Sequence, residues 1–279
     1  MKFFNVDLYD YYKVQKPENG RADLSCYLLD NSHEIGIDRK HSAMLVLPGG
    51  GYEWCSVREA EPVALRYLGF GFCSFVLNYS VAPIRYPYSL AEAIMAMNYI
   101  REHAEEFNVD PNKVSAVGFS AGGHLCASLG SFYNSPEAHK IFTPTENVRP
   151  DAVILSYPVI TCKGKTHMGS FLALCGDDKE LMNKLDILNL VNKDSSPAFI
   201  WSTYEDGCVA CRNALLCAEK YEENDVRFSI HIFGKGQHGL SVADHTVYPN
   251  EDFRLSMTES VPKWVELSIE WLKELDLYN

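Results

Sequence analysis

The sequence predicts an α/β protein with a mostly parallel central sheet and helices on both of its faces. Short β-branched and apolar runs alternate along the chain with longer segments of helical period. Such alternation is typical of parallel strands joined by crossover helices. No linker rich in Pro, Gly or Ser separates two regimes of composition, so we expect a single domain over residues 1–279.

The expected elements follow one another in a regular order. The candidate strands are LSCYLLD (24–30), SAMLVLP (42–48), FCSFVLNY (72–79), KVSAVGF (113–119), DAVILSYP (151–158), AFIWST (198–203) and RFSIHIF (227–233). The candidate helices are Val57–Leu68, Leu90–Phe107, Ala121–Ser131, Cys208–Glu223 and Val261–Leu275. Pro87 and Ser89 favour a helix start before Leu90, and NVDPNK (108–113) is a turn by composition.

One region interrupts this order. Residues 161–196, after the expected strand DAVILSYP (151–158), contain no clear strand. We expect either a small cap over a pocket or a plain excursion that carries a short helix. At this length the insertion is short for a lid, and it says little about substrate choice.

Composition and charge exclude several classes of partner. Apolar residues make up 47% of the chain, and 25 Lys and Arg residues against 37 Asp and Glu residues give a net charge of −12. An acidic surface does not suit nucleic acid or an anionic membrane as the main partner. The N-terminal stretch MKFFNVDLYDYY contains Asn5, Asp7 and Asp10, and these polar residues interrupt it before an apolar run long enough for a signal peptide can form. We therefore expect a cytoplasmic protein without a nucleic-acid or membrane partner.

The cysteines indicate a reducing compartment. The chain has nine, an odd number, scattered from Cys26 to Cys217, which is not typical of a disulfide framework in a protein of this size. CVAC (208–211) has the spacing of a redox or zinc pair but lacks a second ligand pair. We expect ordinary thiols there and no metal.

The stretch AVGFSAGGH, Ala116–His124, predicts a tight turn from a strand into a helix. Such a turn leaves no room for side chains beside it, so Gly118 and Gly122 relieve the crowding and Ser120 at the apex is exposed above the helix N-terminus. An activated serine needs a base, a carboxylate that orients the base, and donors for the oxyanion. All are expected at the carboxyl ends of the strands, where open α/β sheets bind their ligands.

Three other loops after strands supply those groups. PGGGYEW, Pro48–Trp54, would let backbone N–H groups approach a substrate, so we expect Gly50 and Gly51, together with Ala121 after the serine, to form an oxyanion hole. The alternative is a glycine-rich turn without a ligand; G-x-G-x-x-G spacing and a Walker lysine are missing. YEDGCV offers Glu205 or Asp206 as the carboxylate, and GKGQHGLS offers His238 as the base.

Along the chain the serine comes first, then the acid, then the histidine. This order is that of one serine-hydrolase fold and disfavours the other serine-hydrolase folds. Among the other histidines, His124 is expected to pack behind the turn, and His231 within a strand is expected to be structural. His167 and His245 lie in irregular segments and are candidates for lining the pocket.

These segments resemble the α/β-hydrolase lipase/esterase group that includes bifunctional acetyl-xylan and feruloyl esterases, a group of carbohydrate esterases. The resemblance rests on LPGGGYEW, SVREAEPVALRYLGFGFCSFVLNYSVAP, NVDPNKVSAVGFSAGGHLCASLG, SSPAFIWSTYEDGCV and GKGQHGLS, and it spans nearly the whole chain. It implies the α/β-hydrolase fold with Ser120 as nucleophile and His238 as base. In this group the acid precedes a Val-Pro pair by three residues, which selects Asp206 over Glu205. Ala210 stands where the proline is usual.

The resemblance implies a serine carboxylic-ester hydrolase for short acyl groups, with acetylated sugars or oligosaccharides as the expected substrates and no cofactor. Tyr52 and Glu53 are expected at the pocket entrance, although Tyr52 could equally be a packing residue. A serine peptidase or amidase of the same fold is the second interpretation, and the chain carries no propeller repeat or large cap to favour it. A catalytically silent binding protein is disfavoured, because all three triad residues are present. The sequence leaves assembly into a homo-oligomer open.

Overall fold

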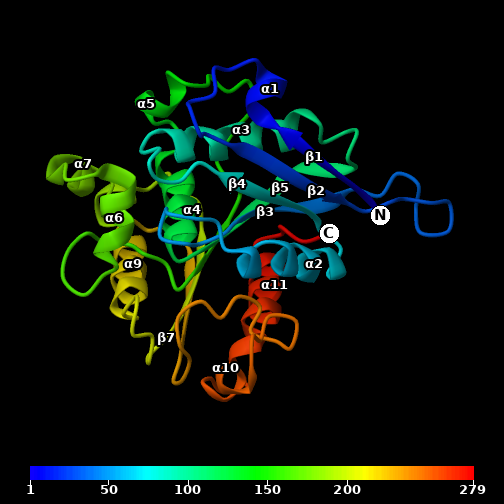
Figure 1. Cartoon of the computed structure of the whole chain (residues 1–279). Helices are drawn as coiled ribbons and strands as arrows, with labels where there is room; N and C mark the ends of the chain where they lie inside the picture. The colour runs from blue at the N-terminus through cyan, green and yellow to red at the C-terminus, as the bar shows by residue number, and fades with distance from the viewer.

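The computed structural model describes residues 1–279 and contains one eight-stranded sheet (Figure 1). The strand order is β1-β2-β4-β3-β5-β6-β7-β8, antiparallel for the β1–β2 and β2–β4 pairs and parallel elsewhere. The strands are β1 (Lys2–Asp7), β2 (Ala22–Leu28), β3 (His41–Leu47), β4 (Cys73–Tyr79), β5 (Val109–Phe119), β6 (Val153–Ser156), β7 (Ala198–Thr203) and β8 (Phe228–Phe233).

Helices cover both faces of this sheet (Figure 1). They are α1 (Leu8–Tyr12), α2 (Glu61–Gly69), α3 (Tyr88–Glu102), α4 (Ala121–Phe132), α5 (Pro136–His139), α6 (Met168–Cys175), α7 (Lys179–Lys184), α8 (Ile187–Leu190), α9 (Arg212–Glu223), α10 (Glu251–Leu255) and α11 (Trp264–Glu274). Short 3-10 turns at Val57–Glu59 and Val261–Lys263 precede α2 and α11. None of the helices is both long and apolar enough to cross a bilayer.

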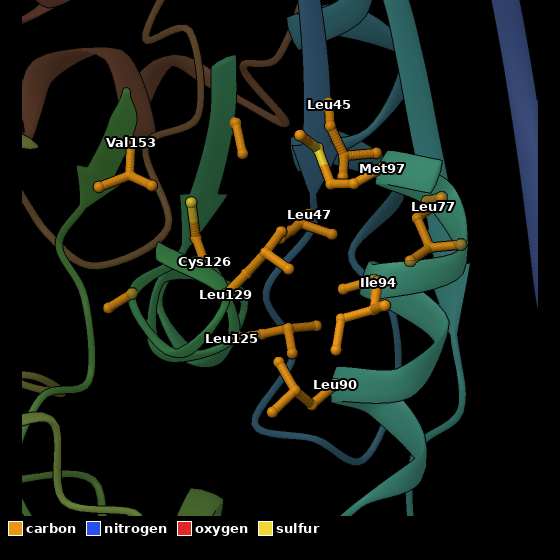
Figure 2. Packing of buried hydrophobic residues seen from close by; sticks show 14 of the residues in the cluster. Leu45, Leu47, Leu77, Leu90, Ile94, Met97, Leu125, Cys126, Leu129 and Val153 are labelled. Atoms are coloured by element: carbon orange, nitrogen blue, oxygen red, sulfur yellow. The ribbon is translucent and has the colours of Figure 1, made fainter. Parts of the chain in front are cut away.

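The alternation of side chains along the strands sorts the core into two layers. In β3, Leu45 and Leu47 belong to the cluster that also contains residues of α3 and α4, and Figure 2 shows Leu45 beside Met97 of α3 and Leu47 beside Leu129 of α4. The intervening Val46 belongs to the other cluster, which includes residues of α2 and α11. Both faces are apolar because a parallel sheet is covered on both sides.

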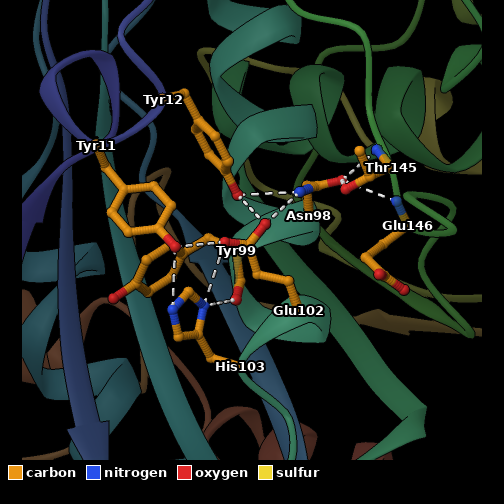
Figure 3. Close-up of polar contacts among 8 residues, drawn as sticks. All are labelled: Tyr11, Tyr12, Asn98, Tyr99, Glu102, His103, Thr145 and Glu146. Atoms are coloured by element: carbon orange, nitrogen blue, oxygen red, sulfur yellow. Dashed lines mark hydrogen bonds and ion pairs between the residues drawn. The ribbon is translucent and has the colours of Figure 1, made fainter.

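A polar cluster connects α1, α3 and the loop before β6 (Figure 3). We call it the α3 polar cluster, and it consists of Tyr11, Tyr12, Asn98, Glu102, His103 and the backbone of Tyr99, Thr145 and Glu146. The Glu102 carboxylate accepts hydrogen bonds from the hydroxyls of Tyr11 at 2.6 Å and Tyr12 at 2.9 Å. The Asn98 side-chain oxygen accepts from the amides of Thr145 and Glu146. The cluster therefore ties the N-terminal segment and a long loop to one helix.

The structure confirms the predicted strands and adds one. AFIWST has the predicted bounds, and the others differ only at their ends. The sequence analysis missed β1, because Asn5 and Asp7 interrupt its apolar pattern; it is an edge strand paired only with β2. The turn expected at NVDPNK is wrong, since Val109 already pairs with His41 and a register shift follows before Ala43 pairs with Val114.

The helical predictions needed adjustment in several places. The helix expected over Leu90–Phe107 runs from Tyr88 to Glu102, and the first three residues of the helix expected from Val261 form a 3-10 turn. The helix expected from Val57 is a 3-10 turn followed by α2, which carries a proline in its first turn. Residues 208–211 form a turn, and regular helix begins at Arg212. The insertion 161–196 carries three short helices, α6, α7 and α8, where one was expected.

Candidate active site

The turn between β5 and α4 is as crowded as its glycines predict. A Cβ on Gly118 would lie 2.1 Å from the Gly122 carbonyl oxygen, and a Cβ on Gly122 would lie 2.2 Å from the Leu47 carbonyl oxygen. Neither position admits a side chain. Ser120 at the apex has φ 53° and ψ −118°, a strained conformation for a residue with a Cβ atom. This turn directs the serine hydroxyl away from the sheet edge.

The fold brings Ser120, His238 and Asp206 into one hydrogen-bonded chain. Ser120 Oγ lies 2.8 Å from His238 Nε2, and His238 Nδ1 lies 2.7 Å from Asp206 Oδ2. The three residues follow β5, β7 and β8, whose parallel pairing aligns their carboxyl ends at one edge of the sheet. An imidazole held between a hydroxyl and a carboxylate can accept the hydroxyl proton.

The loop after β7 holds Asp206 and leaves Glu205 outside. Asp206 is buried, and its Oδ1 accepts hydrogen bonds from the amides of Cys208 at 2.9 Å and Val209 at 2.8 Å. Glu205 is exposed to solvent. Ala210, which replaces the usual proline, does not prevent this turn. The geometry therefore favours Asp206 as the partner of the imidazole, in agreement with the family pattern.

The glycine loop after β3 presents unused amide donors beside the serine. Gly50 and Gly51 have φ angles of 122° and 68°, and neither amide donates a hydrogen bond within the protein. Both residues border the same cavity as Ser120. Ala121 occupies the first position of α4, where an amide has no partner within the helix. The three amides predicted as oxyanion donors are thus available for a ligand.

A buried carboxylate that the sequence analysis missed joins the glycine loop to the histidine loop. Glu59 is 3% exposed; its Oε2 accepts from the Gly49 amide at 2.9 Å, and its Oε1 accepts from the Tyr157 hydroxyl at 2.7 Å. The Tyr157 oxygen accepts from the Ser241 amide, and its ring lies edge-on to His238 with centroids 5.0 Å apart. Burial raises the pKa of Tyr157 well above its usual value. We call this arrangement the Glu59–Tyr157 bridge.

The cavity over Ser120 is small. Its volume is about 200 Å³, and besides the glycines, Ser120 and His238 it is bordered by Trp54, Arg58, His167 and Cys208. His167 comes from the start of the insertion, so part of the 161–196 segment reaches this cavity. A space of this size suits a short acyl group.

Two predicted entrance residues lie in different environments. The Tyr52 side chain is only 3% exposed, and its hydroxyl lies 2.9 Å from His124 Nδ1. The prediction that Tyr52 lines the entrance is therefore wrong, and the packing alternative holds. Glu53 is exposed, and its carboxylate lies 3.8 Å from where a Cβ on Gly51 would be. Glu53 is not among the residues that border the cavity, and its place at the entrance stays a prediction.

The remaining histidines separate as their sequence positions suggest, with one exception. His124 packs behind the turn between β5 and α4, and its Nε2 lies 2.8 Å from the Leu185 carbonyl oxygen. Burial lowers the pKa of His124 to about 4. His231 stacks on Phe199. His167 borders the cavity, whereas His245 is exposed and is not among the residues that border it.

A second serine–histidine contact lies nearby. His167 Nδ1 is 2.9 Å from Ser170 Oγ. Ser170 is only 1% exposed, and no carboxylate is hydrogen-bonded to His167. This pair lacks both the access and the orienting acid that the Ser120 site has.

The order of the strands, the tight turn from β5 into α4, and the loops after β7 and β8 together define an α/β-hydrolase fold. Solved structures of esterases share it. An acetyl ester-xyloside bifunctional hydrolase from Caldicellulosiruptor lactoaceticus aligns with a TM-score of 0.82 and 32% identity, covering 99% of this chain and 97% of that one. A carboxylesterase from Lactobacillus plantarum aligns with a TM-score of 0.87 and 27% identity, covering 100% and 99%.

The chain belongs to the BD-FAE family, whose model matches residues 33–221. It is 37% identical over 220 residues to endo-1,4-beta-xylanase B of Butyrivibrio fibrisolvens and 27% identical over 237 residues to an acetylxylan esterase of Xylanibacter ruminicola. These alignments cover 74% and 82% of this chain but only 34% and 46% of the two relatives. The chain thus spans less than half the length of either relative.

Proposed function

We propose that this protein is a serine carboxylic-ester hydrolase that removes short acyl groups, with acetylated sugars or oligosaccharides as its substrates. One observation carries the proposal: the hydrogen-bonded chain from Ser120 through His238 to Asp206 ends at a cavity into which the free amides of Gly50 and Gly51 open. A nucleophile, its base and donors for a developing negative charge are the groups that acyl transfer needs.

In the first half-reaction, Ser120 Oγ attacks the ester carbonyl carbon while His238 Nε2 takes the hydroxyl proton. Asp206 keeps Nδ1 protonated and stabilises the imidazolium that forms. The tetrahedral oxyanion accepts hydrogen bonds from the amides of Gly50, Gly51 and Ala121. His238 then gives its proton to the leaving alcohol oxygen, and the acyl group remains on Ser120.

In the second half-reaction, water replaces the alcohol. His238 removes a proton from the attacking water, the same amides hold the second oxyanion, and the proton returns to Ser120 Oγ as the carboxylic acid departs. The strained backbone of Ser120 contributes by holding the hydroxyl in one position throughout.

The substrate class rests on three observations. The two curated relatives are named for xylan chemistry, and the Caldicellulosiruptor enzyme is named for acetyl esters and xylosides. The cavity of about 200 Å³ favours a small acyl group over a long chain. Trp54, which is 57% exposed at the cavity, offers a flat aromatic face against which the apolar face of a sugar ring can pack.

The proposal extends to organisation and location. We propose a single domain over residues 1–279 in which segment 161–196 forms a small cap beside the cavity, because His167 of that segment borders it. We also propose a cytoplasmic location, supported by the odd number of scattered cysteines.

A panel of p-nitrophenyl esters from acetate to decanoate tests the activity. We expect the acetate to have the highest kcat/KM, and we expect Ser120→Ala to lower kcat by roughly 10⁴-fold or more. Ser170→Ala is the matched control, since it removes another serine hydroxyl that lies within hydrogen-bond distance of a histidine, His167. Wild-type activity in Ser120→Ala, or its loss in Ser170→Ala, would overturn the assignment; a preference for long chains would overturn the substrate class.

A further inference from the structure

Arg58 borders the same cavity as Ser120 and His238. Arg58 lies in the 3-10 turn that follows the glycine loop. Its Nη2 is 3.2 Å from where a Cβ on Gly239 would be, and its Cζ lies 5.0 Å from the centroid of the Phe253 ring. The side chain is therefore held beside the loop that carries the candidate base.

Within the protein the Arg58 guanidinium contacts the Phe253 ring but has no hydrogen-bond or ion-pair partner. The only hydrogen bond of Arg58 uses its backbone carbonyl oxygen, which accepts from the Ser241 hydroxyl, and no carboxylate lies within ion-pair distance of its side chain. Its Nε is buried without any hydrogen-bond partner. Arg101, which is more deeply buried, likewise has an Nε without a partner, but its Nη2 donates to the Asp151 carboxylate at 2.8 Å. Because charges that are partly removed from water are normally paired in proteins, a half-buried guanidinium without a hydrogen-bond or ion-pair partner at a cavity indicates a missing anion.

The two carboxylates of the candidate site are engaged elsewhere. The Glu59 carboxylate accepts from the Gly49 amide and the Tyr157 hydroxyl, and the Asp206 carboxylate accepts from two amides and contacts His238. No other lysine or arginine borders the cavity. In a chain with a net charge of −12, Arg58 is thus a local positive charge where the protein as a whole repels anions.

The position of Arg58 indicates which part of the ester carries the anion. His238 must give its proton to the leaving alcohol oxygen, so the alcohol lies on the His238 side of Ser120. Arg58 lies against Gly239, the residue directly after His238. A carboxylate matches the planar guanidinium through two parallel hydrogen bonds.

We propose that Arg58 binds a carboxylate on the alcohol part of the substrate, so the preferred esters are those of an acidic alcohol, such as an acetylated sugar acid. This inference rests on the proposed ester hydrolysis at Ser120 and adds a specificity-determining residue to it. Neutral acetyl esters enter the same cavity but leave the guanidinium unpaired.

Two substrates that differ only in this charge provide the test: 3-acetoxybenzoate and 3-acetoxybenzamide. Both release the same acetyl group, and the ratio of their kcat/KM values reports recognition of the carboxylate. We expect Arg58→Met, which keeps the contact with Phe253, to lower this ratio about 10- to 100-fold. Arg58→Lys should restore part of the ratio, because lysine keeps the positive charge. It should not restore all of it, because an ammonium group cannot form the two parallel hydrogen bonds of a guanidinium.

Arg39→Met is the control variant. Arg39 is exposed in the loop before β3, at the opposite end of the strands, so its loss changes the net charge equally and should leave the ratio unchanged. The wild-type protein gives an independent measurement that does not depend on a variant folding. We expect 3-hydroxybenzoate to inhibit hydrolysis of the neutral ester at least about tenfold more tightly than 3-hydroxybenzamide.

The outcomes separate the two proposals. Equal ratios in wild type and Arg58→Met, or equal inhibition by the two phenols, would overturn the role of Arg58 while leaving ester hydrolysis intact. Failure of the wild-type protein to hydrolyse either substrate would overturn the proposed function itself.

Discussion

The α3 polar cluster and the Ser120 site contain the same three kinds of group, a hydroxyl, an imidazole and a carboxylate, but arrange them differently. In the α3 polar cluster the Glu102 carboxylate accepts directly from the hydroxyls of Tyr11 and Tyr12 (Figure 3). His103 Nε2 also lies 3.2 Å from the Tyr11 oxygen, but its Nδ1 is turned to the Tyr99 carbonyl oxygen at 2.9 Å and not to a carboxylate that would orient it. At the Ser120 site the imidazole stands between the hydroxyl and the carboxylate.

The consequence of this difference is chemical. A hydroxyl bound directly to a carboxylate is held in its neutral form, and the Glu102 contact raises the pKa of Tyr11 to about 12. A hydroxyl bound to an imidazole can lose its proton to a base whose pKa lies near neutrality. The Ser120 site also leaves the amides of Gly50 and Gly51 unused, whereas the α3 polar cluster consumes its donors internally. Two features therefore distinguish a reactive cluster from a structural one more than its composition does: which group the hydroxyl is bonded to, and whether hydrogen-bond donors are left free for a ligand.

The largest expected effect comes from exchanging the two histidines for glutamine in turn. His238→Gln removes the base, so we expect kcat on p-nitrophenyl acetate to fall by about 10⁴-fold or more, with little change in melting temperature. His103→Gln should leave kcat within about twofold and lower the free energy of unfolding by about 1 kcal/mol. Steady-state kinetics and thermal unfolding of both variants check this. Similar losses of kcat in both would remove the distinction between the clusters.

The carboxylate of Glu92 on α3 extends the comparison, because its titration should change the free energy of unfolding with pH and leave catalysis unaffected. It is fully buried and accepts from the Tyr9 hydroxyl and the Ser80 amide, and burial raises its pKa from 4.5 to about 7. The folded state therefore keeps a proton that the unfolded state releases, and this contribution to stability is lost as pH rises from 4.5 through 7. Relative to Glu92→Gln, the wild-type protein should lose about 3 kcal/mol across that window.

Urea unfolding of wild type and Glu92→Gln at pH 4.5 and pH 8 measures this difference. Activity provides the contrast, because Glu92 does not border the Ser120 cavity and its titration should not appear in kcat. A stability difference that is the same at both pH values would show that Glu92 is ionised in the folded protein.

The Glu59–Tyr157 bridge is expected to have an intermediate effect on catalysis. Glu59→Gln preserves shape but replaces one carboxylate oxygen by an amide nitrogen, so the side chain can no longer accept from both the Gly49 amide and the Tyr157 hydroxyl, which allows the glycine loop to shift. Small displacements of oxyanion donors are costly, so we expect kcat/KM to fall about 10- to 100-fold with a smaller change in KM. Tyr157→Phe, which breaks only one contact of the bridge, should cost less than Glu59→Gln. A loss confined to KM would assign Glu59 to substrate binding instead.

The smallest expected effect concerns Trp54. Trp54→Ala removes the exposed aromatic face at the cavity, so KM for an acetylated xylo-oligosaccharide should rise about 5- to 10-fold, equivalent to about 1 kcal/mol. KM for p-nitrophenyl acetate should change much less, because it carries no sugar ring. Equal changes for both substrates would argue against sugar packing at Trp54.

The residues that were predictable from the sequence are those that follow buried strands. Ser120, Asp206 and His238 each come after an apolar run whose direction is set by parallel pairing, so their meeting at one edge follows from the fold. Glu59 does not follow a buried strand, and nothing in the sequence around it shows that its carboxylate turns inward to Gly49 and Tyr157. Tyr52 was misplaced for a related reason: its neighbouring glycines indicate where the backbone goes but not which side chains return to the core.

The most direct measurement of the central claim is the site of modification by a fluorophosphonate, mapped by mass spectrometry on the intact and digested protein. We predict one adduct, on Ser120, that is absent from Ser120→Ala and forms far more slowly in His238→Gln. An adduct on another serine such as Ser170, or a wild-type protein that stays unmodified under conditions that label a known serine esterase, would contradict the account.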